Sequence, residues 1–399
     1  MRRLDARTEQ FLLGRAVRAE LPARVRNAFT GRRVLITGAG GSVGSELARH
    51  LAVCQPAEIV LLDHAEYLLF STMQALADFT GTVTLHPVLA DVSRPEDVIA
   101  VCSAHRPEYV FHAAACKHVT IAEQCIVTAV RTNVLGAAYT ARAANDVGAR
   151  FILVSTDKAA EPHSVMGATK RLAELSVMDG RTGGGAVAVR FGNVLGSSGS
   201  VVEVLMDAAR AGRPLTVTDP GATRFFMTAA EAASLVLKAA VAGRSGDVFW
   251  LDMGTPLRLS DLVTRILDVV TPQGMTRPAV RVIGLRPGEK RNEELTTGDL
   301  TMEPTEDRAI WRARQAPFSG SLPIALEQLR RACAAGDAEL ALLVVEKTVA
   351  DYTPSAEARA AAHRASRAAR ADGRNRSINA EARAALIGPT AMHRLRRLA

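Results

Sequence analysis

Short apolar runs alternate with amphipathic stretches along the first half of the chain. Each run is rich in valine, isoleucine and leucine, and such runs are typical of buried strands. The stretches between them carry apolar residues at helical spacing. Because strands that alternate with helices pair in parallel, the pattern predicts an α/β fold with a doubly wound parallel sheet. We expect strands at residues 33–37, 59–62, 83–88, 109–112, 151–154 and 187–191, and a return to the sheet at 247–252.

The remaining segments differ in character. Residues 1–30 have the pattern of a helical arm, and a long helix is expected from about Ala122 to Val147. Another helix is expected from Gly167 to Met178. Residues 193–353 are less regular and predict a smaller C-terminal lobe that ends in two short helices within 324–349. After Pro354 the chain is rich in alanine and arginine, and we expect a marginal helix or a disordered tail.

Composition limits the class of protein. With 399 residues and 48% hydrophobic residues, the chain can build a large core of the kind found in globular enzymes. No apolar run approaches the ~20 residues of a membrane helix, and the N-terminus has no secretory signal, so we expect no membrane insertion and a cytoplasmic protein. Five cysteines without a C-x-x-C pair argue against a disulfide framework and against a zinc site, and we predict no metal.

The net charge of +8 raises the question of nucleic-acid binding. Residues 354–399 contain ten arginines and three acidic residues, so this segment carries +7 of the total. The body of the protein is therefore nearly neutral, and we predict no nucleic-acid partner. The tail is expected to be solvated, with binding to an acidic partner as the alternative.

A glycine-rich turn joins the first predicted strand to a helix. Gly38, Gly41 and Gly44 follow the strand at a G-x-x-G-x-x-G spacing, and residues after Gly44 continue with helical period. Glycines allow a tight turn and let backbone N–H groups approach a pyrophosphate at the helix N-terminus. The strand–turn–helix context favours a dinucleotide site over a purely structural turn. We therefore predict that residues 31–192 form a Rossmann-like NAD-binding domain, with Ser42 and Val43 also at the cofactor.

Other cofactor contacts are expected at the ends of the following strands. Asp63 ends the second strand, where a carboxylate binds ribose hydroxyls and repels a 2′-phosphate, which favours NAD over NADP. The alternative for Asp63 is a helix-capping role. Asp91 and Val92 are expected at the adenine edge, and three alanines are expected to leave room for the cofactor against the backbone. The other predicted contacts are polar or charged. These residues are Asp91, Val92, Ala113, Ala114, Ala115, Lys117, Asn133, Ser155 and Lys170.

The stretch after the fifth strand carries the candidate chemistry. Thr156, Asp157 and Lys158 follow residues 151–154 directly, at the strand end where open α/β sheets bind ligands. A hydroxyl, a carboxylate and an ammonium group together can move protons on one substrate. The alternative is a polar turn followed by a helix that carries Lys170. A Gly/Ser-rich loop at 192–200 opens a further helix and predicts a second anion site.

Several motifs, in order, resemble the bacterial nucleotide-sugar 4,6-dehydratases of polysaccharide biosynthesis, which belong to the extended short-chain dehydrogenase/reductase superfamily. The resemblance covers the chain from Val34 to about Tyr352. It is carried by the motifs TGAGGSVGSEL (37–47), HAAACKHV (112–119), STDKA (155–159), VMGATKRLAE (165–174), RFGNVLGS (190–197) and LRPGEK (285–290).

The resemblance implies a cycle of C4 oxidation by NAD, C5 proton abstraction, loss of the C6 hydroxyl and return of hydride to C6. Lys158 would be the base, Asp157 the acid, and Thr156 or a water, aided by the positive charge of Lys170, would contact the 4-hydroxyl. Met166 stands where the superfamily usually has a tyrosine, as it does in the resembling subfamily. A basic Lys158 would need a lowered pKa. The nucleotide sugar would be held by Lys117, His118, Asn193, Ser200, Val201, Thr218, Arg224, Arg286 and Glu289.

Departures from the family pattern leave the outcome open. Cys116, Thr120, Ala122, Glu161 and His163 differ from the residues usual in the family, and so do residues 291–292. UDP-N-acetylglucosamine is the expected substrate, and 4-epimerisation or a 5,6-unsaturated product are the alternatives. A non-catalytic nucleotide-sugar sensor, supported only by the methionine at position 166, is a third. The resemblance also implies a homo-oligomer, with the N-terminal arm docked on a neighbour.

Overall fold

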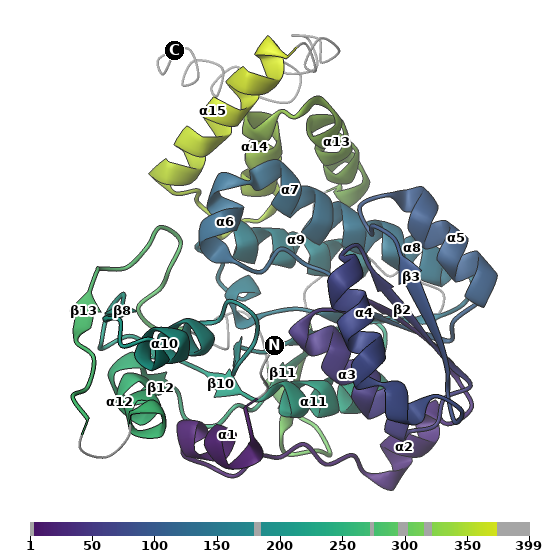
Figure 1. The fold of residues 1–399 in the computed structure, drawn as a ribbon. Helices are drawn as coiled ribbons and strands as arrows, with labels where there is room; N and C mark the ends of the chain where they lie inside the picture. The colour runs from purple at the N-terminus through teal and green to yellow at the C-terminus, as the bar shows by residue number, and fades with distance from the viewer. Residues whose placement is uncertain (1–3, 179–184, 272–274, 294–301, 315–320, 373–399) are drawn as a thin grey trace.

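The computed structural model describes residues 4–178, 185–271, 275–293, 302–314 and 321–372 (Figure 1). A nine-stranded sheet organises the molecule, in the order β14-β15-β11-β6-β5-β4-β1-β2-β3. Seven neighbouring strands, from β11 to β3, are parallel, whereas β15 is antiparallel to both β11 and β14. The strands are β1 (Arg33–Thr37), β2 (Glu58–Asp63), β3 (Thr84–Leu89), β4 (Tyr109–His112), β5 (Arg150–Val154), β6 (Ala186–Arg190), β11 (Asp247–Leu251), β14 (Met302–Pro304) and β15 (Ile310–Arg314).

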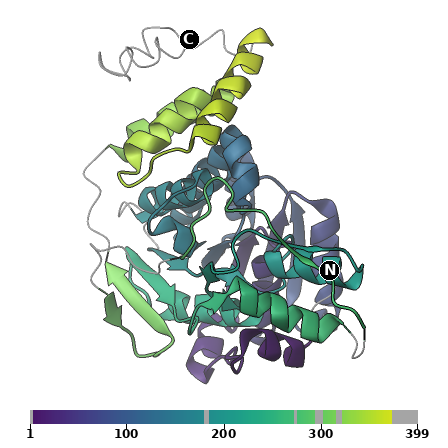
Figure 2. The same ribbon diagram turned by 90° about the vertical axis from the view of Figure 1, so that its left-hand side faces the viewer.

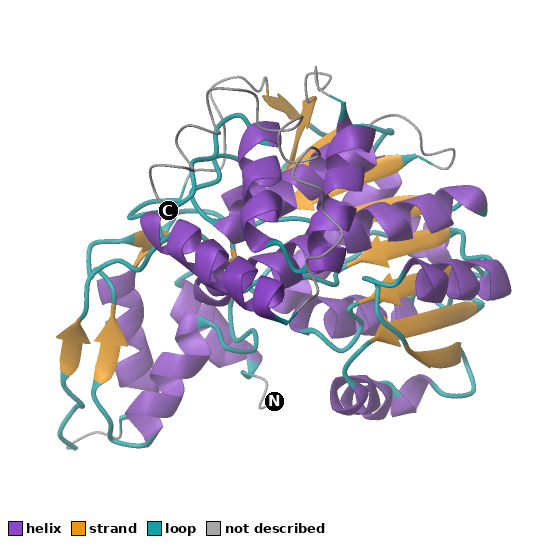
Figure 3. Cartoon of the chain, turned by 90° about the horizontal axis from the view of Figure 1, so that it is seen from above, coloured by secondary structure: helices purple, strands orange, loops and turns teal. Residues whose placement is uncertain are grey.

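Alternate residues of each strand enter two different hydrophobic cores, which is why the runs are apolar throughout. In β1, Val34 and Ile36 face one core, while Leu35 faces the other. Viewed from above, the strands form a stack with helices on both sides (Figure 3). The first core is covered by α2 (Ala23–Phe29), α3 (Ser42–Val53), α4 (Glu66–Ala75) and α11 (Ala229–Ala242), and the second by α5 (Pro95–His105), α8 (Ala137–Asp146) and α9 (Val165–Met178). A 3-10 turn, η1 (Ala77–Phe79), follows α4. The predicted doubly wound parallel sheet is confirmed.

A smaller lobe lies beside the carboxyl ends of the strands, at the left of Figure 1. Its separate core joins α10, α12 and β8 to Leu12 and Leu13 of α1 (Ala6–Leu13). Arg15, just after α1, pairs with Glu231 of α11 at 2.5 Å, so the N-terminal arm packs on its own chain. The lobe consists of β7 (Asn193–Val194), α10 (Val201–Arg210), β8 (Leu215–Val217), β9 (Thr223–Arg224), β10 (Phe226–Met227), β12 (Leu257–Arg258), α12 (Leu259–Val270) and β13 (Val280–Val282).

The predicted helix from 122 to 147 is wrong in detail. It is broken at Cys125, and its second part contains a π-helical segment, which shifts the side chains on either side relative to a regular α-helix. The pieces are α6 (Val119–Gln124), α7 (Ile126–Val130), the π segment η2 (Arg131–Gly136) and α8. The expected helix from Gly167 begins two residues earlier, at Val165, and Lys170 therefore falls in its second turn.

After Pro354 a marginal helix or a disordered tail was expected, and the first part of this segment forms a helix that is packed on the rest of the protein. Helix α15 (Ala356–Ala371) packs on α14 (Ala338–Thr348), which follows α13 (Leu322–Ala335). Its buried stripe is made mostly of alanines, whose weak hydrophobicity hides the period in the sequence. Arginines on its other faces pair with acids of α14, as Arg359 does with Glu346 at 2.6 Å. The three helices stand together at the top of Figures 1 and 2. Residues 373–399 lie outside the described part.

Candidate active site

The glycine turn between β1 and α3 is shaped by close backbone approaches. Gly38 has φ +67°, and a Cβ there would lie 2.6 Å from the backbone nitrogen of Ala114, in the loop after β4. A Cβ on Gly44 would lie 2.1 Å from the carbonyl oxygen of Gly38. Only glycine fits either position. The two loops meet where the strand order reverses between β1 and β4, which is the place where such sheets bind ligands.

Asp63, at the end of β2, is tied to this turn. Its Oδ2 accepts a hydrogen bond from Gly40 N at 2.9 Å, and its Oδ1 accepts one from Ala65 N at 2.9 Å. The residue is 5% exposed, so its carboxylate is held in one orientation beside the glycine turn. Asp91 is fixed in a similar way, because its Oδ1 accepts a hydrogen bond from Ser93 N at 2.9 Å.

Two residues predicted to contact the cofactor, Asn133 and Ser155, are buried. The Asn133 side chain is fully buried, accepts a hydrogen bond from Cys116 N and donates to Cys116 O and Thr169 Oγ1. Ser155 Oγ donates to Glu174 Oε1 at 2.6 Å. Because these polar atoms are already used inside the protein, both side chains are placed to position the loops, not to touch a cofactor directly. Of the other predicted residues, Ala113, Ala114 and Ala115 lie in the loop after β4, Ser42 and Val43 begin α3, and Val92 lies between β3 and α5.

The Thr-Asp-Lys corner forms a continuous chain of hydrogen bonds in the 3-10 turn η3 (Asp157–Ala159). Thr156 Oγ1 donates to Asp157 Oδ1 at 2.8 Å, and Lys158 Nζ donates to the same oxygen at 3.1 Å. Asp157 is 2% exposed. Among the described residues, its other oxygen, Oδ2, is buried without a hydrogen-bond partner. The predicted acid is therefore behind Lys158 and not on an open surface.

Lys158 differs from expectation in its electrostatics. Burial lowers the pKa of its ammonium group, but the carboxylates of Asp157 and Glu293 reverse this effect, so the net pKa is raised. Glu293 Oε1 lies 3.3 Å from the ammonium nitrogen. The predicted lowering of this pKa is wrong for the structure as it stands. Nearby Lys170 behaves oppositely: burial lowers its pKa to about 8, and its Nζ donates to Val154 O at 2.6 Å.

Met166 belongs to the hydrophobic core between α9 and the C-terminal helices and is 5% exposed. Behind the corner, Glu174 and Arg190 form a fully buried pair, with Arg190 Nε donating to Glu174 Oε1 at 2.7 Å. Arg190 also lies 4.5 Å from the centre of the Trp250 ring. These contacts support the strand end from which Thr156 emerges.

A cavity of ≈ 300 Å³ lies between the corner and the lobe. Lys158 reaches its wall, and so does Glu293. The structure brings to this wall every residue that the sequence assigned to the nucleotide sugar: Lys117, His118, Asn193, Ser200, Val201, Thr218, Arg224, Arg286 and Glu289.

The sequence missed Glu293. Its carboxylate lies 3.3 Å from Lys158 Nζ and 3.8 Å from Arg224 Nε, so it joins the Thr-Asp-Lys corner to the predicted phosphate site. Arg224 is held by backbone as well, because its guanidinium donates to the carbonyls of Lys290 and Arg291 at 2.8 and 2.9 Å. The only signal in the sequence was that Glu293 follows the LRPGEK motif closely.

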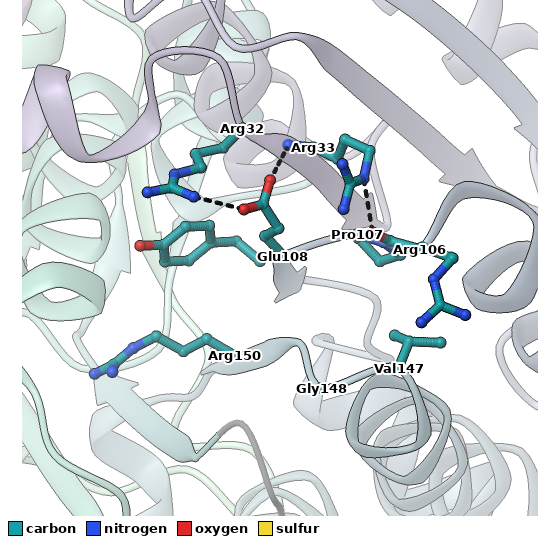
Figure 4. Close-up of a pocket in the computed structure, with 9 residues that line it drawn as sticks. Arg32, Arg33, Arg106, Pro107, Glu108, Val147, Gly148 and Arg150 are labelled. Atoms are coloured by element: carbon teal, nitrogen blue, oxygen red, sulfur yellow. Dashed lines mark hydrogen bonds and ion pairs between the residues drawn. The ribbon is translucent and has the colours of Figure 1, made fainter.

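A second cavity, of ≈ 350 Å³, lies at the opposite ends of the strands (Figure 4). It is rich in arginine, but three of its four arginines have internal partners: Arg32 and the backbone of Arg33 bind Glu108, and Arg150 donates to Gly243 O. Since the glycine turn and the Thr-Asp-Lys corner are at the carboxyl ends of the strands, the chemistry belongs to the first cavity. No helix in the described ranges has the length and apolarity needed to cross a bilayer.

Known proteins resemble this chain over most of its length. Among characterised sequences, it is 41% identical over 299 residues to the probable polysaccharide biosynthesis protein EpsC of Bacillus subtilis, covering 73% of this chain and 49% of that protein. The chain thus spans about half the length of that relative. It is also 32% identical over 282 residues to a UDP-glucose 4-epimerase of Rickettsia typhi, covering 68% of this chain and 79% of the epimerase.

Solved structures share the fold. Pen from Bacillus thuringiensis has a TM-score of 0.67 and 28% identity, over 73% of this chain and 90% of that one. The dTDP-glucose 4,6-dehydratase DesIV from Streptomyces venezuelae, solved with NAD, has a TM-score of 0.59 and 23% identity, over 67% and 88% of the chains. The model of the family described as "Polysaccharide biosynthesis protein" matches residues 34–315. The chain therefore belongs to the polysaccharide biosynthesis protein family.

Proposed function

We propose that this chain is an NAD-dependent nucleotide-sugar 4,6-dehydratase, with UDP-N-acetylglucosamine as its substrate. The observation that carries the proposal is the position of Lys158, which lines the sugar-sized cavity and is hydrogen-bonded to the chain formed by Asp157 and Thr156. Elimination of water from a hexose needs a base at C5 and an acid at C6, and this corner contains both kinds of group, with Lys158 on the cavity wall and Asp157 buried behind it. The similarity to EpsC and to DesIV agrees with such an activity.

The glycine turn fits a dinucleotide. A Cβ on Gly38 or Gly44 would collide with backbone atoms, so both positions need glycine, as in turns whose backbone approaches a bound pyrophosphate. Gly38, Gly41, Gly44 and Asp63 would hold the cofactor. Asp63 favours NAD, since its buried carboxylate would repel a 2′-phosphate. When bound, NAD supplies an acceptor and later a donor of hydride.

The observed protonation state must change before Lys158 can act as a base. In the structure, the raised pKa of Lys158 corresponds to an ammonium beside a carboxylate. Lys158 must release this proton to solvent, and its 20% exposed side chain on the cavity wall gives the proton a route to water. A substrate that fills the cavity and expels water then favours the neutral amine, since charges are less stable in an apolar environment.

A neutral Lys158 and a protonated Asp157 account for the proton movements of an elimination, with Asp157 receiving its proton from the sugar 4-hydroxyl through Thr156 during C4 oxidation. Lys158 Nζ takes the proton from C5, which the ketone at C4 has made acidic, and returns it to C5 when hydride reaches C6. The C6–O bond breaks, and the leaving oxygen needs a proton to depart as water. Because Asp157 is 2% exposed, we route this proton through Thr156: Asp157 Oδ1 gives its proton to Thr156 Oγ1, which gives its own to the leaving oxygen. Arg224 and Arg286 would bind the diphosphate.

The alternative is a nucleotide-sugar 4-epimerase, and the 32% identity with the Rickettsia enzyme favours it as the second candidate. In an epimerase, Lys158 would only bind the sugar. A 5,6-dehydratase would use Lys158 as a base but would not return hydride to C6 in the usual way.

The test is to incubate the full chain with NAD and UDP-N-acetylglucosamine and to follow the product by mass spectrometry and NMR. A 4,6-dehydratase gives a 4-keto-6-deoxy sugar that has lost one water. An unchanged mass with inverted C4 supports the epimerase, and no reaction with any UDP- or dTDP-hexose contradicts both. Lys158→Ala should abolish water loss and keep NAD binding, whereas Lys238→Ala, which removes a lysine paired with Asp307 away from the cavity, should leave both unchanged.

A further inference from the structure

Three side chains outside the active site meet at the β3 edge of the sheet. Glu58 opens β2, His86 lies in β3 and His105 is the last residue of α5. One donor atom from each side chain lies within 4.8 Å of the other two. Two imidazoles and one carboxylate are the donor set of many zinc sites that leave the fourth position to water.

The separations match those around a metal ion better than those of hydrogen bonds. His86 Nε2 lies 3.3 Å from Glu58 Oε2, and His105 Nδ1 lies 3.5 Å from Glu58 Oε1. Both are longer than a normal N–H···O hydrogen bond. Two ligands at tetrahedral angles around zinc, with bonds of about 2.0–2.1 Å, are separated by about 3.4 Å. Each histidine therefore lies near a ligand–ligand distance from one oxygen of the Glu58 carboxylate, and the donor atoms of the two imidazoles lie within 4.8 Å of each other.

An unsatisfied acceptor points to the same conclusion. Within the described part of the chain, Glu58 Oε1 is buried and accepts no hydrogen bond. Buried polar atoms normally have a partner, and a bound cation would supply one. His105 also ends α5, where the free carbonyl groups of a helix C-terminus favour a positive charge.

We propose that Glu58, His86 and His105 bind a divalent transition-metal ion of the zinc class. The cysteine pattern that argued against zinc in the sequence does not bear on this site, because no cysteine takes part. Such an ion would join β2, the edge strand β3 and α5. Strand β3 has no fully buried residue, so a metal link would supply the anchoring that its side chains lack. The site is at the start of β2, whereas Asp63 is at its end, so its role is structural and not catalytic.

The test uses the full chain without a histidine tag, stripped of metal with a chelator and titrated with zinc chloride by calorimetry. We expect one equivalent of zinc at this site, and His86→Ala and His105→Ala should each weaken its binding by at least about tenfold. Glu58→Gln keeps the shape of the side chain and should act in the same direction. His363→Ala is the matched control, because it removes a half-exposed histidine that also pairs with a glutamate, Glu339.

Thermal melting and cobalt substitution give independent readouts. Saturating zinc should raise the melting temperature of the wild-type protein and of the control but not of His105→Ala. Bound cobalt(II) should show no thiolate charge-transfer band. Wild-type zinc affinity in the His86→Ala/His105→Ala double variant, a thiolate band, or the absence of zinc binding by the wild-type chain would each overturn the proposal. Circular dichroism shows which variants are folded, and Glu58→Gln replaces any that is not.

Discussion

The charge of Glu293 offers a direct test of the proposed base. Its carboxylate lies 3.3 Å from the Lys158 ammonium, whose side chain is 20% exposed. At an effective dielectric constant of 20, two unit charges at this distance attract each other by about 5 kcal/mol. Asp157, at 3.1 Å, adds a similar attraction. The two carboxylates together outweigh burial, which on its own lowers the pKa of Lys158.

Glu293→Gln removes one of these charges and keeps the shape of the side chain. The pKa of Lys158 should then fall. Since the base must be neutral, activity rises with pH up to the pKa of this lysine, and the rising limb of the profile should move to lower pH. If solvent and salt leave only a fifth of the attraction, about 1 kcal/mol, the limb still moves by about 0.7 pH unit.

The assay is the pH dependence of kcat/KM for water loss, or of deuterium uptake at C5 from heavy water. The position of the limb reports the titration even if the variant is slower at every pH. Glu289→Gln is the control, because Glu289 lines the same cavity but accepts its hydrogen bond from Arg286 N. A limb that stays in place, or moves to higher pH, in Glu293→Gln would refute the assignment of Lys158 as the base.

Other substitutions test the surrounding framework. Glu174→Gln leaves the buried Arg190 charge without its carboxylate partner and should lower the free energy of unfolding by about 3 kcal/mol or more in urea titrations. Glu327→Gln, on an exposed helix face, should change this free energy far less. Gly44→Ala should abolish NAD binding in calorimetry, because its Cβ would meet a backbone oxygen at 2.1 Å, while Gly148→Ala, with open space around it, should preserve binding. Thr156→Val should lower kcat by on the order of 100-fold and Thr156→Ser should restore most of it; equal loss in both would exclude a hydroxyl relay.

The sequence predicted the features that depend on local order along the chain. Apolar runs placed seven strands of the sheet, because six of them are parallel strands buried between two layers of helices and the edge strand β3 keeps apolar residues between its polar ones. The glycine spacing predicted the close approach of α3 to the end of β1, because a Cβ at Gly44 has no room. The residues that line the first cavity were predicted from the motif resemblance. They lie on one cavity because the smaller lobe packs over the ends of the strands.

Features set by tertiary contacts were not predictable in this way. Strands β14 and β15 were missed, because β14 has only three residues and β15 joins the sheet through β11, which lies far from it in sequence. The sequence did not show that α15 is a packed helix. Its buried positions are mostly alanines, which differ little in hydrophobicity from their neighbours, and the acids that pair with its arginines are on α14. The pKa of Lys158 was predicted in the wrong direction for the same reason. Its sign depends on Asp157 and on Glu293 together, and Glu293 lies 135 positions away in the sequence.

The methionine at position 166 makes Thr156 the stronger candidate for the first proton transfer. A thioether carries no proton, and Met166 is packed in the core. Two groups near the corner remain, Thr156 and Lys170. Lys170 donates to the Val154 carbonyl, which cannot store a proton, whereas Thr156 donates to Asp157 Oδ1, a carboxylate that can. A proton released from the sugar 4-hydroxyl to Thr156 therefore has a place to go, and the same carboxylate can return it when the C6 oxygen leaves. Lys170, with its pKa lowered to about 8 by burial, can add positive charge without having to move a proton at all.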